Sequence, residues 1–324
     1  AKHLVAIDRP FTTIVAGNKS ANDDIKAIFD EAGKDVVITA NVMPQFNKLN
    51  IEPARDAIRQ LFISRIIEAK GLNILQSMTS YKIIPTPLAV LHACELLSKG
   101  TKTQQGRGDL LAVDIGGATT DVYSMASGEP TVDNTMLKGL PEPWMKRTVE
   151  GDLGMRYSLT HVYEQIPGSD NPENEYMQQV KAWVELCTAR PDTLAAPGSE
   201  EEKLEEFLGR SAVSMAVGRH CGRIADVFTP LGLMHTQEGK DLWNATSVIG
   251  IGGVLRNSRR PEEILKGSLY DFMHPECTKP RKPKFYLDQK YIFASMGLLR
   301  SINPELAFEL LDKETVEIGC NATV

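Results

Sequence analysis

Two aspartates flank a pair of glycines in the stretch LLAVDIGGATTDVYSM, residues 110–125. Gly116 and Gly117 allow a tight turn and let backbone N–H groups approach a ligand closely, as in the backbone nests that bind phosphate oxygens. Asp114 and Asp121 cannot bind phosphate themselves. They can hold Mg²⁺ through water, and the metal then neutralises the phosphate oxygens. The stretch therefore predicts a phosphate-binding turn with a magnesium ion.

The same residues predict a β-hairpin. LLAVD forms its first strand, the two glycines its turn, and TTDVYSM its second strand. Because side chains alternate along a strand, Thr119 and Asp121 should lie on one face of the second strand. Gly-Gly turns are common, so an ordinary hairpin with two solvated aspartates explains these residues as well.

A second glycine cluster follows an apolar strand in SVIGIGGVLRNSRRPEEIL, residues 247–265. Gly250, Gly252 and Gly253 lack side chains, so a flat ring could lie against the backbone at the carboxyl end of this strand, where open α/β sheets bind ligands. A helix should begin near Pro261. One glycine cluster is weak evidence, but its place after a phosphate hairpin and a long insert, and before a terminal helix, strengthens it.

Alternating strands and helices are expected before these motifs. FTTIVAGNK, residues 11–19, predicts a buried strand, and a helix should follow through about Ala32. A second strand, DVVITANV, leads to a helix over residues 50–72 that begins near Pro53. This order predicts a mostly parallel sheet covered by helices.

A domain boundary is expected near residue 103. Thr86 can cap, and Pro87 can open, a helix that ends near Gly100. The polar stretch TKTQQGRGD then predicts a linker. The chain thus divides into residues 1–102 and 103–324, the second part with a helical insert around residues 151–240.

Four further segments follow the hairpin in the sequence. The charged tract 189–207 should be exposed, and SAVSMAVGRHCGRIADVF, residues 211–228, should be a helix. The strand KFYLD, residues 284–288, and a helix over residues 289–302 follow it.

Composition limits the possible classes of protein. The chain has 324 residues, a formal charge of −6 and 42% hydrophobic residues, which favour two globular domains over a nucleic-acid-binding or membrane-surface protein. No apolar stretch approaches the ~20 residues of a membrane span, and residues 1–20 lack the apolar region of a signal peptide. We expect a cytosolic protein with five reduced, scattered cysteines and no zinc site.

Together these elements resemble the actin, sugar-kinase and heat-shock-ATPase superfamily, whose actin-like (ribonuclease H-like) α/β fold closes two related domains over Mg-ATP. DIGGATTD is similar to its second phosphate motif and IGIGGVLRN to its adenosine motif. PTPLAVLHACELL and YIFASMGLL resemble its two connecting helices, which should touch at Ala89 and Gly297. The site residues that the resemblance implies are Gly116, Gly117, Ala118 and Thr119 for the phosphates, Gly252 and Gly253 for the nucleoside, Arg256 for adenine, Asp114 and Asp121 for magnesium, and Thr119 with Asp121 for catalysis.

More closely, the chain from about Val15 onward resembles the MutL family encoded beside glutamate mutase, also called GlmL and unrelated to the mismatch-repair protein of the same name. The resemblance lies in AGNK, NVMP, EPARDAIR, IIPTPLAVL, AVDIGGATTDVYS, RTVEGDLGMR, IGIGGVLRN and YIFASMGLL. It implies an ATP-handling accessory protein, a reactivating chaperone, whose partner is an adenosylcobalamin-dependent mutase and whose cofactors are ATP or ADP with Mg²⁺.

Two more segments could reach the nucleotide. In RTVEGDLGMR the resemblance implies a helix that begins at Gly151 and Asp152 beside the phosphates, with its amides favouring an anion. A surface turn with a solvated Glu150 is the alternative. Arg219 and His220 could contact the ribose or phosphates, or could simply belong to a packed or exposed helix face.

The sequence departs from the superfamily pattern at two places. The first phosphate hairpin is absent, because VAIDRPFTTIVA has no glycine before Gly17, and we therefore expect a chain that lacks part of its first domain. Thr86 occupies the position where chaperone ATPases carry a glutamate that positions the attacking water. The sequence thus predicts ATP binding and leaves open whether the protein is a weak ATPase.

The resemblance to this superfamily is also compatible with two other functions. A small-molecule kinase has the same fold, since fold does not fix function, but it needs a catalytic carboxylate in the first domain. An actin-like filament former is the third hypothesis, which no residue favours or excludes.

Overall fold

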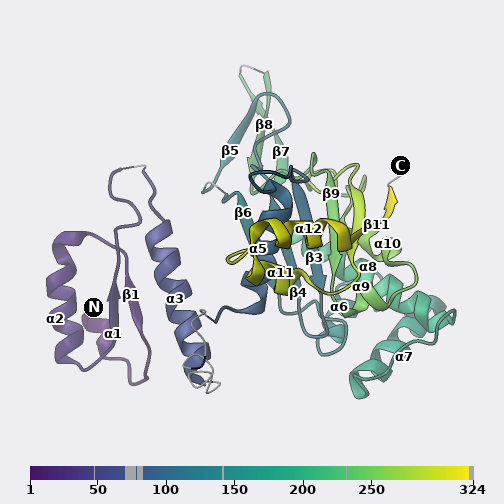
Figure 1. Ribbon diagram of the computed structural model, residues 1–324, viewed down its shortest axis with the longest axis horizontal. Helices are drawn as coiled ribbons and strands as arrows, with labels where there is room; N and C mark the ends of the chain where they lie inside the picture. Colours follow the sequence, from purple (N-terminus) through teal and green to yellow (C-terminus); the bar gives the residue numbers. More distant parts are fainter. Residues whose placement is uncertain (47, 70–77, 79–82, 141, 231, 321–324) are drawn as a thin grey trace. The chain divides into compact units, whose positions relative to one another are not determined.

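The chain divides into two units between Pro85 and Thr86. The computed structural model describes residues 1–46, 48–69, 78, 83–140, 142–230 and 232–320, and Figure 1 shows the elements of each unit. The division lies ahead of the boundary expected near residue 103, because the helix that begins at Thr86 packs within the second unit.

The first unit contains a small parallel sheet with helices. Its strands pair in parallel with Thr13 opposite Val36, as the alternating pattern predicts. The prediction of a helix beginning near Pro53 is also confirmed, and the end of the predicted segment lies outside the described residues. The elements are α1 (Lys2–Val5), β1 (Thr13–Val15), η1 (Lys19–Ala21), α2 (Asn22–Glu31), β2 (Val36–Ile38) and α3 (Glu52–Ala69).

The second unit is built on a six-stranded mixed sheet in the order β11-β10-β9-β3-β4-β6. Strands β3, β9 and β10 run parallel to one another, whereas β4 is antiparallel to β3 and β6, and β11 is antiparallel to β10. The strands are β3 (Leu110–Ile115), β4 (Thr120–Met125), β6 (Met145–Glu150), β9 (Ser247–Ile251), β10 (Lys284–Asp288) and β11 (Thr315–Cys320). Strand β9 is buried along its whole length, which explains its nearly continuous apolar sequence.

Helices cover both faces of this sheet (Figure 1). On one face, α5, α11 and α12 pack against Leu110, Ala112 and Tyr123. On the other face, α6 to α10 pack against the alternate strand residues, such as Leu111 and Val113. The helices are α5 (Thr86–Lys99), α6 (Leu159–Glu164), α7 (Glu175–Ala189), α8 (Glu200–His220), α9 (Gly253–Asn257), α10 (Pro261–Leu265), η2 (Lys266–Ser268), α11 (Phe293–Leu299) and α12 (Pro304–Glu314). The period-two alternation of the strands thus divides the core into two layers.

A separate three-stranded sheet extends from the second unit (Figure 1). Its order is β5-β8-β7, from β5 (Thr135–Lys138), β8 (Gly232–Glu238) and β7 (Arg223–Thr229). The prediction of one helix over residues 211–228 was therefore wrong at its end. The helix stops at His220, and the residues after Gly222 pair with β8 instead, a long-range contact that local helix propensity does not reveal. The expected helical insert, residues 151–240, contains α6, α7 and α8 but also these two strands.

Helix α8 begins inside the tract that was expected to be exposed. The Ser199 side chain accepts the N–H of Glu202 at 3.3 Å, and three glutamates occupy the first turn, where the helix dipole favours negative charge. Leu204 and Glu206 are buried, so the tract forms one wall of the core.

Candidate functional site

The predicted glycine hairpin forms at the carboxyl edge of the six-stranded sheet. Strands β3 and β4 pair antiparallel with Asp114 directly opposite Asp121, and the N–H of Gly116 donates to the carbonyl of Thr119 at 2.9 Å. Opposite residues of an antiparallel pair share one face, so both carboxylates lie on the side of the sheet that α5 and α11 cover.

The segment that follows β6 donates hydrogen bonds to the carbonyls of this turn. The N–H groups of Met155 and Arg156 donate to Gly116 and Gly117 at 3.0 and 2.8 Å, and the Ser158 hydroxyl donates to Ala118 at 2.9 Å. Gly154 permits this contact, because a Cβ there would lie 2.2 Å from the carbonyl carbon of Ala118.

Three amides of the turn, by contrast, have no acceptor among the described residues. Within the described part of the chain, no hydrogen bond is made by the N–H groups of Gly117, Ala118 and Thr119. Successive backbone N–H groups without an acceptor are the donors that bind phosphate oxygens in such turns. The turn thus has the donors that the sequence predicted for a phosphate.

A third carboxylate, Asp288, joins the two predicted ones. It ends β10, and its two oxygens accept the N–H groups of Ile292 and Phe293 at 3.0 and 3.1 Å, so it holds the start of α11. Its charge also acts on Asp114. Sequence reasoning missed Asp288, although KFYLD was recognised as a strand. The signal was available, because the carboxyl ends of parallel strands meet at one edge of a sheet.

Asp114 is the least compensated of these three carboxylates. Burial, followed by the nearby charges of Asp121 and Asp288, raises its pKa to about 6, and Arg147 only partly opposes this. Asp121 instead has Arg147 as a direct partner, with Nε 2.8 Å from its Oδ1. No side chain among the described residues donates to the Asp114 carboxylate, so a cation would relieve its charge.

These acidic residues do not form a complete metal centre. In the described ranges, no group of three or more His, Cys, Asp or Glu side chains is arranged to hold a metal ion. Mg²⁺ commonly binds through one or two carboxylates and takes its other ligands from water and phosphate. The magnesium site at Asp114 and Asp121 therefore remains a prediction.

A cavity of about 600 Å³ opens beside the turn, on the face opposite the two aspartates. It is lined on one side by Gly116 and Gly117 and on another by Gly253 and Asn257 of α9. The structure thus brings the predicted phosphate turn and part of the predicted nucleoside motif into one cavity of ligand size. Asp114 and Asp121 do not line the cavity. They lie in β3 and β4 directly before and after the turn whose Gly116 and Gly117 do line it.

The two glycines of the second motif have different surroundings. Gly252 adopts φ +102°, and a Cβ there would lie 2.5 Å from the carbonyl oxygen of Ile115 and 2.8 Å from Oδ1 of Asp114. Its lack of a side chain therefore permits close packing of β9 against β3. A Cβ on Gly253 would meet only Asn257, at 3.9 Å, so this glycine leaves space in the cavity.

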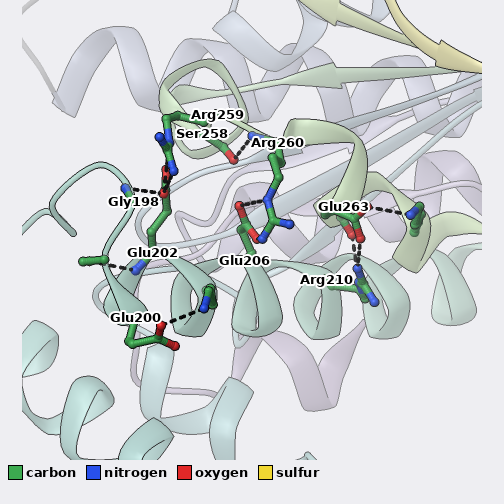
Figure 2. Close-up of polar contacts among 12 residues, drawn as sticks. Gly198, Glu200, Glu202, Glu206, Arg210, Ser258, Arg259, Arg260 and Glu263 are labelled. Carbon is green, nitrogen blue, oxygen red and sulfur yellow. Dashed lines mark hydrogen bonds and ion pairs between the residues drawn. The ribbon is translucent and has the colours of Figure 1, made fainter.

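Ion pairs join α8 to the residues after α9 (Figure 2), and Glu202, Glu206 and Arg259 of these pairs line the cavity. Nε of Arg259 lies 3.0 Å from Oε1 of Glu202, and Nε of Arg260 lies 3.1 Å from Oε1 of Glu206. Glu205, which like Glu202 and Glu206 belongs to α8, pairs with Arg156 at 2.7 Å. Sequence reasoning missed these glutamates, although their spacing of three and four residues would have placed them on one face of a helix.

Other predicted residues lie elsewhere. Arg256 is exposed, does not line the cavity, and acts electrostatically on Asp288 and Tyr291. Thr119 lies in the turn, with its hydroxyl 3.5 Å from Oδ2 of Asp121. Gly151 lies in a turn outside the cavity.

The expectation of a helix beginning at Gly151 was wrong. The next helix is α6, and Asp152 instead pairs with Arg219 at 2.7 Å. Glu150 pairs with the same arginine, so it is not simply solvated. His220 is buried between the hydroxyls of Ser124 and Thr148, which excludes contact with a ligand in the cavity.

The fold and site define a mixed α/β protein with a ligand-sized cavity beside a glycine turn. The family model for the MutL protein matches residues 1–315. Protein MutL of Clostridium tetanomorphum is 44% identical over 321 residues, which cover 98% of this chain and 69% of that protein. The chain belongs to the MutL family, as the sequence resemblance predicted. None of the helices in the described ranges is long and apolar enough to cross a membrane.

Proposed function

We propose that this protein binds Mg-ATP and Mg-ADP at the glycine turn and the adjoining cavity. The observation that carries the proposal is one cavity with Gly116 and Gly117 on one side and Gly253 on another. The free amides at the turn suit phosphate oxygens, and the space at Gly253 suits a nucleoside. The order of hairpin, insert, glycine strand and terminal helix supports an actin-like ATPase fold for the second unit.

Magnesium would bind at the sheet edge with Asp114 and Asp121 as its protein anchors. The uncompensated charge of Asp114 supports this assignment, and Asp288 adds to the negative potential without giving up its hold on α11. When bound, the metal supplies positive charge that neutralises the phosphate oxygens.

The biological role we propose is that of a reactivating accessory protein for an adenosylcobalamin-dependent mutase of the glutamate mutase type. Membership of the MutL family supports this role, together with the motifs that resemble the family encoded beside glutamate mutase. Exchange of ATP for ADP would alter the surface that the partner binds, because a ligand shifts a conformational equilibrium through differential affinity.

Calorimetric titration with ADP, with and without Mg²⁺, tests the site. Gly253→Leu should reduce ADP affinity at least about tenfold, because the new side chain fills space that the backbone leaves open. Asp114→Asn should retain metal-free binding and lose the gain that Mg²⁺ gives. Gly151→Leu is the matched control, since a Cβ there meets nothing within 4 Å and the residue lies outside the cavity. Equal ADP affinity in the wild type and Gly253→Leu would exclude this cavity.

A further inference from the structure

A second cavity, of about 830 Å³, is lined by residues of α8, of η2 and of the segment that follows η2. We call it the α8–η2 cavity. Residues 165–167, after α6, complete its lining. It shares no lining residue with the cavity beside the glycine turn. Its volume lies within the range of small-molecule sites, so it could hold a ligand of its own.

Apolar side chains form one part of this lining. They are Ile166, Pro167, Phe207, Met215, Leu269 and Phe272. Phe272 is 65% exposed, and its ring meets that of Tyr270 edge-on, with the two centroids 5.5 Å apart. The apolar body of a ligand would be favoured here, because it removes this surface from water.

A buried ammonium group adjoins the lining. Lys279 is only 5% exposed, and its Nζ donates to the Ser214 hydroxyl at 2.9 Å and to the Gly267 carbonyl at 3.3 Å. Both acceptors line the α8–η2 cavity. The third N–H of the ammonium has no acceptor among the described residues, and Asp271 acts on Lys279 electrostatically without forming an ion pair. Because an unpaired buried charge is costly, an anion beside it would be stabilised.

Ser214 connects this ammonium to the cavity. Its oxygen accepts from Lys279, whereas its own O–H donates to no group in the part of the chain that the structure describes. Linked hydrogen bonds polarise one another, so a hydroxyl that accepts from a cation becomes a stronger donor. Ser214 therefore offers a donor to an anionic group inside the cavity.

The charges around the cavity also favour an anion. Arg210 lines the cavity and pairs with Glu263 (Figure 2), and Lys266, which also lines it, pairs with the same carboxylate at 2.6 Å. Asp271 is the only acidic residue among the described lining residues. The three cations Arg210, Lys266 and Lys279 thus outnumber these two carboxylates.

We propose that the α8–η2 cavity binds a small amphipathic anion, a carboxylate with an apolar body. The carboxylate accepts the O–H of Ser214 beside the Lys279 ammonium, and the body covers the apolar lining. This site is separate from the proposed nucleotide site, and neither depends on the other.

Calorimetric titration of the whole chain with octanoate, 1-octanol and octylammonium tests the class of ligand. The three probes share one alkyl chain and differ in the charge of the head group. Octanoate should bind saturably at one site and at least about tenfold more tightly than 1-octanol, because a hydrogen bond to a charged group is worth more than a neutral one. Octylammonium should not bind. Absence of saturable octanoate binding, or equal affinity for all three probes, would overturn the proposal.

Two substitutions test the position of the carboxylate. Lys279→Met and Ser214→Ala should each weaken octanoate binding at least about tenfold and leave 1-octanol binding unchanged. Lys279→Met should fold, because replacing a buried charge by an apolar side chain of similar volume is often neutral or stabilising. Lys203→Met is the matched control, since Lys203 is an exposed lysine of the same helix that lies outside the cavity.

ADP affinity separates this site from the proposed nucleotide site. It should be the same in Lys279→Met as in the wild type, whatever the outcome of the nucleotide titrations. Wild-type octanoate affinity in both Lys279→Met and Ser214→Ala, or an equal loss in Lys203→Met, would contradict the assigned position.

Discussion

At the scale of single residues, Asp114 is the carboxylate on which the proposed site depends. Its partner across the hairpin, Asp121, is compensated by Arg147, whereas Asp114 is half-buried near two other carboxylates. The same feature that would attract a cation must cost stability while the cation is absent. This balance is typical of binding sites, where charges are arranged for the ligand.

A pH titration of stability should reveal this cost. The pKa of Asp114 is about 6 in the folded protein against an ordinary 3.8, so the folded state binds more protons than the unfolded state between these pH values. The free energy of unfolding should therefore fall as pH rises from about 4 to 7, by up to about 3 kcal/mol. Asp114→Asn should lack this component and exceed the wild type in stability at pH 7 in urea titrations without Mg²⁺. Parallel pH profiles of stability for the two proteins would contradict the raised pKa of Asp114.

At the scale of elements, helices α5 and α11 approach each other closely. A Cβ on Gly297 would lie 1.8 Å from the carbonyl oxygen of Ala89, which confirms the predicted contact of these two residues. The helices cover one face of the sheet, next to Asp114 and Asp288, so their spacing affects the edge where magnesium is proposed.

Two glycine-to-alanine substitutions should have opposite effects. Gly297→Ala should lower the free energy of unfolding by about 1–3 kcal/mol, because the helices must separate to admit a methyl group. Gly218→Ala, in α8, should be neutral or stabilising by up to about 1 kcal/mol, because its Cβ would meet only Lys279, at 3.5 Å, and alanine favours the helix. Thermal unfolding of both variants measures the contrast. A stabilising Gly297→Ala would show that the two helices are not held at this spacing.

At the scale of the whole molecule, the proposed role requires two states with different affinity for a partner. Coupling between two sites is reciprocal and commonly changes affinity about 5- to 150-fold. A MutL-family protein that reactivates a mutase must therefore bind the mutase differently with ATP and with ADP.

Binding of the mutase to the immobilised protein should consequently differ at least about fivefold between saturating Mg-ATP and Mg-ADP. Gly253→Leu should bind the mutase without nucleotide as the wild type does and should lose the difference. Equal affinity with ATP, with ADP and without nucleotide, together with no recovery of inactivated mutase, would exclude the reactivating role. Phosphorylation of a small acceptor would then favour a kinase.

The sequence by itself determined the local elements and the glycine turn. Alternation and apolar runs predicted β1, β2, β3, β4, β9 and β10 but not β5, β6, β7, β8 or β11. Pro53, Thr86 and Pro87 marked helix starts, because capping and backbone restriction act over a few residues. The Gly116-Gly117 hairpin was predictable for the same reason. The family was recognisable because its motifs are long continuous stretches.

Tertiary structure decided which of these residues share a site. Only the sheet order brings Asp288 near Asp114, and only the packing of α8 on the sheet places Glu202 and Glu206 at the cavity. It also gives Gly252 and Gly253 different surroundings and ends α8 before β7. These contacts join segments far apart in the chain, and their energies depend on neighbours that a local pattern of residues does not specify.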